Sequence, residues 1–107
     1  MALEWHPAVV ATDLPSIYAF IARDDFAAAE RVLDAVETTF ELLTRQPECG
    51  VRYRTLNRKL AEVRMLPVIG FENYLVFYRV EGEAVRILYV LHGAQHSHRF
   101  FHREARA

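Results

Sequence analysis

The stretch that decides the fold is Tyr74-Leu-Val-Phe-Tyr-Arg-Val-Glu-Gly-Glu-Ala-Val-Arg-Ile-Leu-Tyr-Val-Leu-His-Gly-Ala94. Two runs rich in Val, Ile, Leu, Phe and Tyr flank the short turn Glu81-Gly82-Glu83, and this pattern predicts a β-hairpin. Each run carries one arginine, Arg79 or Arg86, among apolar residues. Because strands rarely hold charge without a partner or a use, both arginines are candidate functional residues.

The turn also bears on the pairing of the two strands. A two-residue loop would place Arg79 opposite Arg86, and like charges that face each other are disfavoured. We therefore expect a three-residue loop, with Tyr78 opposite Arg86 and Arg79 opposite Val85. This register puts the two arginines on different faces of the sheet.

The first half of the chain predicts a short strand and two helices. Alternation over residues 2–6 indicates the strand. The first helix is marked by Val10, Leu14, Ile17 and Ile21, and Pro15 either kinks it or lies in a first turn that begins near residue 12 or 13. Asp25 is a good N-cap for the second helix, which ends before Pro47. The expected buried stripe of this second helix is Phe26, Ala29, Leu33, Val36, Phe40 and Leu43.

The second half is expected to be mostly sheet. Residues 51–60 look irregular and basic, residues 61–67 read as a strand, and residues 70–73 turn into the hairpin. The order β-α-α-β-β-β predicts an α+β fold, with the helical hairpin on one face of a mainly antiparallel sheet. We expect residues 1–107 to form a single domain, with a polar tail rich in His and Arg over 93–107.

Composition narrows the class of protein. The chain has 107 residues, of which 52% are hydrophobic, and no apolar run reaches the roughly 20 residues of a membrane helix. A lone cysteine, Cys49, and the lack of a recognisable secretory signal predict a cytoplasmic protein that does not bind membranes. Residues 1–50 hold nine acidic and three basic residues, a charge of −6, whereas residues 51–107 hold five and ten, a charge of +5. Folding can therefore produce one acidic and one basic face.

Several clusters could carry chemistry. The cations could form an anion-binding face with Tyr53, Tyr74 and Tyr78 as stacking surfaces, or they could be solvated and paired with acidic neighbours. His92, His96, His98 and His102 have i, i+4 spacing, but no acid or cysteine lies among them, so we expect no metal. We expect no cofactor either, because the chain has no Gly-rich phosphate loop and no activated Ser or Cys. The basic set is Arg52, Arg54, Arg58 and Lys59 in the loop, with Arg64, Arg79 and Arg86 in the strands.

Taken together, these segments resemble the RelE/ParE toxin superfamily over about residues 2–95. The resemblance lies in the order of elements, the segment Asp13-Leu-Pro-Ser-Ile-Tyr-Ala-Phe-Ile-Ala22, the turn Pro47-Glu-Cys-Gly50, and the strand Val63-Arg-Met-Leu-Pro67. Its most specific part is Leu75-Val-Phe-Tyr-Arg79-Val followed by Val90-Leu-His92-Gly93-Ala. The superfamily contains RelE-like ribosome-dependent mRNA endoribonucleases and ParE-like proteins that poison DNA gyrase.

The residues favour the ParE-like branch. By resemblance, the positions of the RelE-like sheet arginine, the arginine after the last strand and the tail tyrosine fall on Leu75, Gln95 and Phe101. Leucine cannot stabilise an anion and phenylalanine cannot transfer a proton. We therefore expect no catalytic residues, and an mRNA endoribonuclease and an inactive binding module remain the alternatives.

The resemblance implies partners and a role. It implies a growth-inhibiting toxin of a type II toxin–antitoxin system, of the kind linked to plasmid stabilization. A ParD-like antitoxin would neutralise it, DNA gyrase would be its target, and direct sequence-specific nucleic-acid binding is not expected. The expected target-binding residues are Arg64, Arg79, Arg86 and His92, because charge on an apolar sheet is costly unless it is used. The antitoxin is expected at the sheet edges and in the groove beside the helical hairpin.

Overall fold

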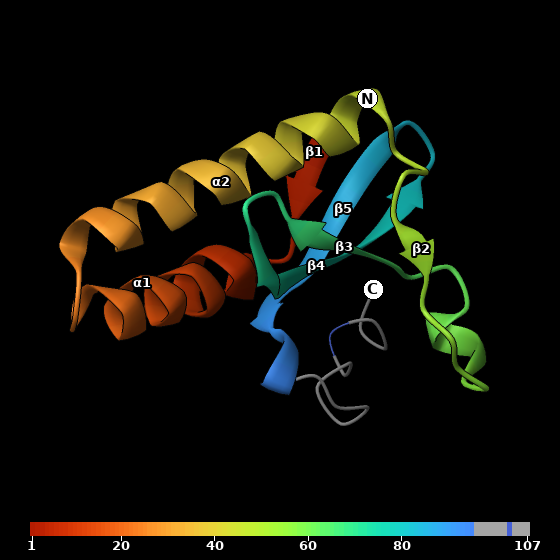
Figure 1. Cartoon of the computed structure of the whole chain (residues 1–107). Coiled ribbons are helices and arrows are strands. Elements are labelled where there is room, and N and C mark those ends of the chain that lie inside the picture. Colours follow the sequence, from red (N-terminus) through yellow and green to blue (C-terminus); the bar gives the residue numbers. More distant parts are fainter. Residues whose placement is uncertain (96–102, 104–107) are drawn as a thin grey trace.

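The computed structural model describes residues 1–95 and residue 103 (Figure 1). A long helical hairpin lies across one face of a five-stranded sheet with the order β1-β5-β4-β3-β2. The helices are α1 (Leu14–Ala22) and α2 (Phe26–Arg45), with a π-helical turn η1 (Val9–Asp13) before α1 and two 3₁₀ turns, η2 (Arg58–Leu60) and η3 (Gly93–Gln95). The strands are β1 (Ala2–Trp5), β2 (Val51–Arg52), β3 (Arg64–Val68), β4 (Phe71–Glu81) and β5 (Ala84–His92).

The α+β class and the grouping of helices and strands are confirmed. β1 pairs in parallel with β5, and the other strand pairs are antiparallel. Three boundaries differ from prediction. The segment predicted as irregular contains the short strand β2, β3 begins at Arg64 because η2 precedes it, and β4 begins at Phe71 inside the predicted turn. A tight turn at Gly70, whose φ is 83°, permits this early start because glycine adopts positive φ without strain.

The helical hairpin follows its capping signals. The Asp25 side chain accepts a hydrogen bond from the Ala28 N–H at 3.1 Å, and α2 ends at Arg45 before Pro47, as predicted. Pro15 lies in the first turn of α1, as the second alternative has it, but the chain is already helical in the π-helical turn η1 directly before α1, which differs from the predicted start near residue 12 or 13.

Two predicted core positions are wrong. Val10 is 52% exposed, and Val9 is buried instead, because the wider π-helical turn rotates the apolar face by one residue. Phe26 is 70% exposed because it lies at the tip of the helical hairpin, which projects beyond the sheet (Figure 1). The other predicted stripe residues of α2 are buried or half-buried.

The predicted hairpin register is also wrong. Arg79 lies opposite Arg86, Val80 opposite Val85, and Glu81 opposite Ala84, so the loop has two residues and both arginines lie on the same face. Gly82 takes the first loop position with a φ of 59°, where two-residue turns commonly require glycine. The facing positive charges are tolerated because Glu81, two residues along the same strand, forms an ion pair with Arg79.

A β-bulge in β5 divides the apolar residues between two clusters. Tyr78 pairs with Ile87 and Phe77 with Tyr89, which leaves Leu88 as an extra residue. Leu88 and Tyr89 therefore both face away from the helices. The main core between helices and sheet includes Val9, Ile17, Val32, Val36, Leu43, Val76, Tyr78, Val85, Ile87 and Val90. The second cluster is Tyr53, Leu60, Val63, Phe77, Leu88 and Tyr89.

Candidate functional site

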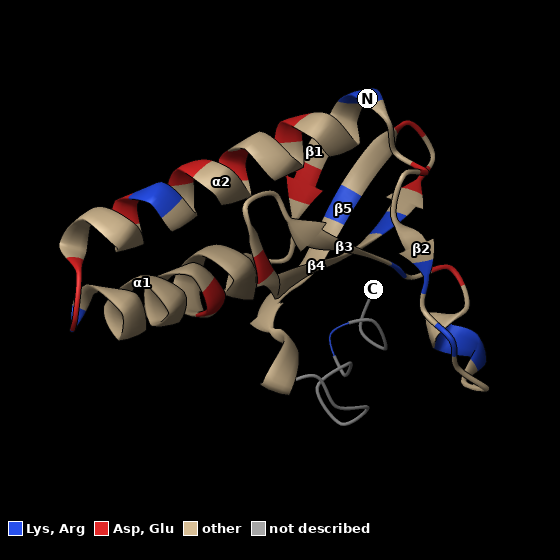
Figure 2. Ribbon diagram, viewed as in Figure 1, with Lys and Arg blue, Asp and Glu red and all other residues tan. Residues whose placement is uncertain are grey.

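Charge is segregated on the folded protein. Figure 2 shows acidic residues along the outer side of α2 and cations gathered around η2 and β2, at the edge of the sheet that β2 forms. The exposed acids of α2 are Glu30, Asp34, Glu37 and Glu41. The expected acidic and basic faces are therefore present.

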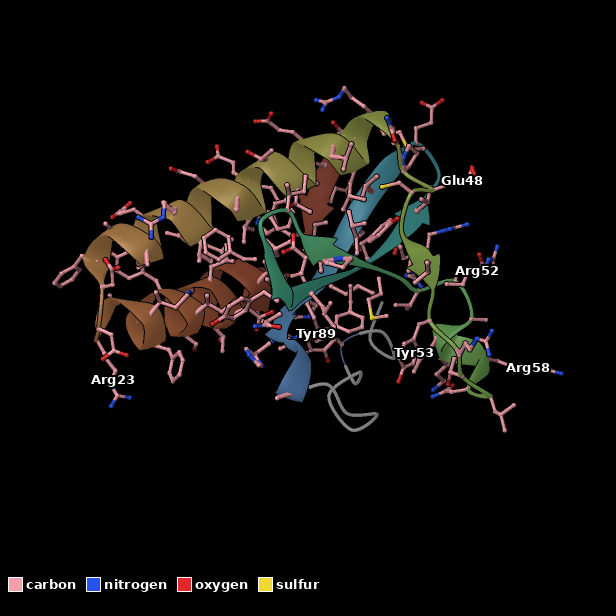
Figure 3. The ribbon with its side chains drawn as sticks, viewed as in Figure 1. Arg23, Glu48, Arg52, Tyr53, Arg58 and Tyr89 are labelled. Carbon is pink, nitrogen blue, oxygen red and sulfur yellow. The ribbon has the colours of Figure 1, made fainter. Side chains whose placement is uncertain are left out.

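The basic loop protrudes from the body of the protein. Arg52, Arg54, Arg58 and Lys59 are all exposed, and Figure 3 shows Arg52 and Arg58 pointing outward. Arg52 lies 3.5 Å from the Glu62 carboxylate, and with both side chains more than half exposed this pair contributes little to stability. The loop therefore agrees with the predicted alternative in which its cations are solvated.

The expected stacking surfaces are not available at the surface. Tyr53 and Tyr74 are each 9% exposed and Tyr78 is fully buried. The Tyr53 ring lies edge-on to Phe77 with a centroid separation of 6.2 Å. These tyrosines pack in the interior because the alternation of the strands, and the anchoring of the loop, turn them inward.

Arg64 holds the turn that follows α2. Its Nη1 donates to the carbonyl oxygens of Gly50 at 2.7 Å and Glu48 at 3.1 Å, and its side chain is 18% exposed. Its Nη1 group is therefore committed to the backbone of residues 48–50, and its Nη2 lies 3.8 Å from the Glu48 carboxylate. A target-binding role for Arg64 stays a prediction.

The two hairpin arginines differ in their surroundings. Arg79 donates from Nε to the Glu81 carboxylate at 2.8 Å, and its Nη2 contacts the same oxygen. This pairing matches the alternative in which the strand arginine has an acidic partner. Arg86 is half-buried on the same face, with Glu4 of β1 as its neighbour in register.

His92 closes the end of β5. Its Nδ1 accepts a hydrogen bond from the Ala94 N–H at 3.0 Å, and its ring lies edge-on to Tyr74 at 5.2 Å between centroids. The other three tail histidines lie outside the described residues, as does Phe101. In the part of the chain that is described, no group of three or more His, Cys, Asp or Glu residues is placed to hold a metal ion.

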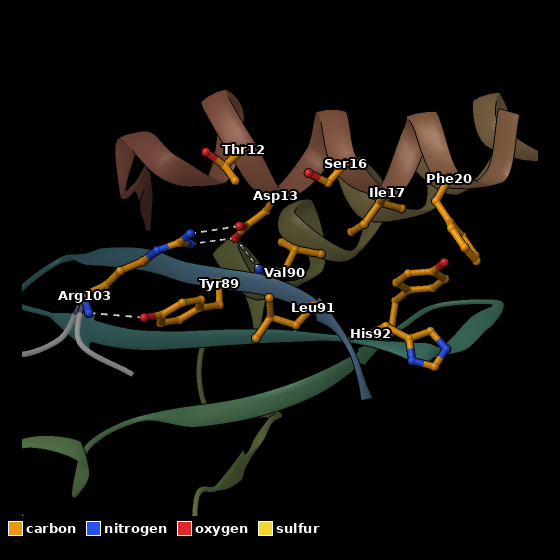
Figure 4. A pocket seen from close by; sticks show the side chains of 11 residues that line it. Thr12, Asp13, Ser16, Ile17, Phe20, Tyr89, Val90, Leu91, His92 and Arg103 are labelled. Carbon is orange, nitrogen blue, oxygen red and sulfur yellow. Dashed lines mark hydrogen bonds and ion pairs between the residues drawn. The ribbon is translucent and has the colours of Figure 1, made fainter. Parts of the chain in front are cut away.

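The sequence did not predict a buried ion pair between Asp13 and Arg103. Asp13, at the end of η1, forms a bidentate ion pair with Arg103, with N–O distances of 2.7 and 2.9 Å (Figure 4). The Asp13 and Arg103 side chains are 4% and 10% exposed. The Arg103 guanidinium also lies 4.1 Å from the centre of the Tyr89 ring, and its backbone N–H donates to the Tyr89 hydroxyl at 3.2 Å.

This ion pair completes an edge of the sheet. β1 stops pairing with β5 near Ile87, so beyond that point the side of β5 that faces away from β4 has no neighbouring strand among the described residues. The Asp13 carboxylate accepts from the Val90 N–H at 3.0 Å, and Arg103 donates to the Leu88 carbonyl oxygen at 2.9 Å. The two side chains thus substitute for a missing strand and satisfy backbone groups that would otherwise be buried without partners. One sequence signal was present: Asp13 lies four residues before Ile17, a member of the predicted apolar stripe.

An apolar groove lies beside this ion pair. It has a volume of about 570 Å³ and runs between α1 and the ends of β4 and β5 (Figure 4). Phe20, which is 64% exposed, lies at the end opposite the ion pair. The groove is lined by Thr12, Asp13, Ser16, Ile17, Phe20, Tyr74, Tyr89, Val90, Leu91, His92 and Arg103.

The buried tyrosines Tyr78 and Tyr89 should make the folded protein less stable at high pH. Burial raises the pKa of Tyr78 and of Tyr89 above the ordinary value of about 10. Because the unfolded chain loses these protons first, the stability they contribute is intact below about pH 10 and falls as pH rises through the folded-state pKa. We expect the free energy of unfolding in urea to fall from pH 9 to pH 11, and to fall less in Tyr89→Phe. An unchanged slope in that variant would contradict this assignment.

The comparisons with known proteins agree with this architecture. A family model described as "ParE toxin of type II toxin-antitoxin system, parDE" matches residues 3–96. The chain belongs to the ParE toxin family. The resemblance to the RelE/ParE superfamily is thereby confirmed. No curated protein matches the chain.

Two solved structures share the fold of this ParE-family chain. One is described as the chromosomal ParDE TA system from P. aeruginosa, with a TM-score of 0.68 and 20% identity over 86% of this chain and 95% of that one. The other is a YoeB/ParE toxin from Agrobacterium tumefaciens, with a TM-score of 0.56 and 18% identity over 86% and 98% of the two chains. Among the described residues of this chain, no helix has the length and apolar composition needed to cross a bilayer.

Proposed function

We propose that this ParE-family protein is the toxin of a type II toxin–antitoxin pair and that it inhibits DNA gyrase by protein contact in the cytoplasm. The observation that carries the proposal is the match of the ParE toxin model to residues 3–96. The geometry supports contact over covalent catalysis. On the sheet, Arg64 binds the backbone, Arg79 binds Glu81, and Leu75 packs against the second apolar cluster.

The nuclease alternative needs an acid, a base and a cation around one phosphate. Tyr89 is a possible proton donor on the sheet, but it is only 2% exposed and its hydroxyl accepts from the Arg103 backbone. The Arg103 guanidinium is occupied by Asp13. These contacts weigh against cleavage at this point of the sheet.

We further propose that a ParD-like antitoxin covers the apolar groove beside α1. An amphipathic helix is the partner that such a groove suits, because its apolar side chains would cover Phe20 and Leu91. The outer edge of β1 offers a second place, for an added strand, since β1 is an edge strand whose Trp5 is 45% exposed. The relative from P. aeruginosa carries the ParDE name, which supports a paired antitoxin.

Induction of the protein without its antitoxin tests the proposed function. We expect growth arrest, chromosomal double-strand breaks and loss of plasmid supercoiling within the time in which total mRNA stays intact. Co-expression of the neighbouring antitoxin-sized gene should abolish all three effects. Rapid, codon-specific cutting of mRNA with intact DNA would contradict gyrase inhibition and favour the RelE-like activity. Absence of any toxicity would favour an inactive binding module.

A further inference from the structure

The loop between β2 and β3 presents an unusual apolar side chain. Leu56 has a relative exposure of 104%, so its whole side chain is in solvent, whereas the other large exposed apolar residues in the described part of the chain are 45–70% exposed. A single exposed leucine is ordinary by itself. Its surroundings distinguish it.

Leu56 is surrounded in sequence by cations without described acidic partners. We call Arg54, Leu56, Arg58 and Lys59 the basic knob; all four are exposed. Residues 51–63 hold four cations and one acid, a charge of +3, and the single acid, Glu62, lies next to Arg52 outside the knob. The knob therefore combines an apolar centre with a positive rim.

The loop is held in shape by its own contacts. The Thr55 hydroxyl accepts from the Asn57 N–H at 3.0 Å, and the Asn57 side chain accepts from the Lys59 N–H at 3.0 Å. At its base, Leu60 and Val63 are buried in the second apolar cluster. The backbone of a loop held in this way loses little conformational entropy on binding, and such preorganisation raises affinity.

We propose that the basic knob is the surface with which the toxin contacts its target protein, and that Leu56 enters an apolar pocket rimmed by carboxylates. This inference rests on the proposed function and adds the contact surface to it. An apolar centre inside a charged rim is the usual anatomy of a protein–protein contact. Nucleic acid is a poorer match, because Leu56 gains nothing from phosphate and the aromatic residue of the same segment, Tyr53, is buried against Phe77.

Inhibition of purified gyrase supercoiling by knob variants tests the inference. Leu56→Asp should raise the toxin concentration for half-inhibition about 10- to 100-fold, the effect of losing one buried leucine. The double variant Arg54→Glu/Lys59→Glu should raise it by at least about tenfold at low salt and reduce the salt dependence of inhibition. Both variants should retain the wild-type thermal unfolding curve, because these side chains are exposed and form no hydrogen bond or ion pair among the described residues.

Matched controls lie on the helical hairpin. Phe26→Asp replaces another exposed apolar residue, and Arg23→Glu/Arg31→Glu makes the same charge change at exposed positions. These controls should inhibit gyrase as wild type does.

The outcomes separate the two proposals. If wild type inhibits gyrase and the knob variants inhibit equally well, the inference is wrong and the function stands. If wild type does not inhibit, the proposed function fails, and the inference falls with it. If the charge variant loses inhibition but Leu56→Asp does not, and the charge variant alone loses binding to duplex DNA, the knob is a nucleic-acid contact and the inference is overturned.

Discussion

Replacing Asp13 by alanine is expected to lower the free energy of unfolding by about 3–5 kcal/mol. The substitution leaves the Arg103 guanidinium, which is 10% exposed, without its bidentate partner. It also leaves the Val90 N–H without its acceptor. Urea denaturation of the purified protein measures the effect, with the m-value checking that the unfolding transition stays the same.

A double-mutant cycle isolates the ion pair. Arg103→Ala should also destabilise the protein, and the combined Asp13→Ala/Arg103→Ala variant should lose less than the sum of the two single losses. Asp13→Asn is the conservative control, because its side-chain oxygen can still accept from the Val90 N–H. If the losses in the free energy of unfolding are additive in the cycle, or if Asp13→Ala loses less than about 1 kcal/mol, the ion pair does not stabilise this edge of the sheet.

Replacing Gly50 by alanine should cost about 3 kcal/mol or more, as overpacking and a disturbed hydrogen bond combine. A Cβ at Gly50 would lie 2.6 Å from the Tyr78 hydroxyl, 2.8 Å from Tyr78 Cε1 and 2.9 Å from the Met65 carbonyl oxygen. Tyr78 is fully buried and the Met65 oxygen belongs to the backbone, so neither can move cheaply. The Gly50 N–H also donates to the Tyr78 hydroxyl at 2.9 Å, and this bond requires the same close approach.

Gly93→Ala is the matched control for this prediction. There the nearest atom to an added Cβ is the Asn73 carbonyl oxygen at 3.4 Å, so a loss below about 1 kcal/mol is expected. Tyr78→Phe should relieve part of the clash in Gly50→Ala, because the closest atom is removed. Thermal and urea unfolding of Gly50→Ala, Gly93→Ala, Tyr78→Phe and the double variant Gly50→Ala/Tyr78→Phe measure these differences. Equal stability of Gly50→Ala and Gly93→Ala would contradict the packing described.

Patterns within short segments of the sequence were sufficient to predict the order of the helices and strands. The apolar spacing of α2, the Asp25 cap and Pro47 fixed that helix to its observed bounds, since each acts within a few residues. The apolar runs around Gly82 predicted β4 and β5 for the same reason. The predicted strand register was wrong because it rested on the repulsion between Arg79 and Arg86. In the structure the two-residue glycine turn sets the register, and the ion pair of Arg79 with Glu81 offsets the repulsion.

The polar site could not be predicted because it joins distant residues. Asp13 and Arg103 are 90 positions apart, and the gap that they fill exists only because β1 is too short to cover the whole of β5. The β-bulge that brings Leu88 and Tyr89 to one face of the sheet could not be predicted, because residues 87–91 are all apolar and do not alternate with polar residues. The cations of the loop, by contrast, were visible as a group because they are close in sequence.

The most direct test of the central claim is a supercoiling assay with purified toxin, purified gyrase, relaxed plasmid and ATP. Gyrase inhibition by contact predicts a dose-dependent loss of supercoiling, with linear DNA released after protein digestion, and reversal when purified antitoxin is added. Unimpaired supercoiling at a large molar excess of folded toxin would contradict the claim.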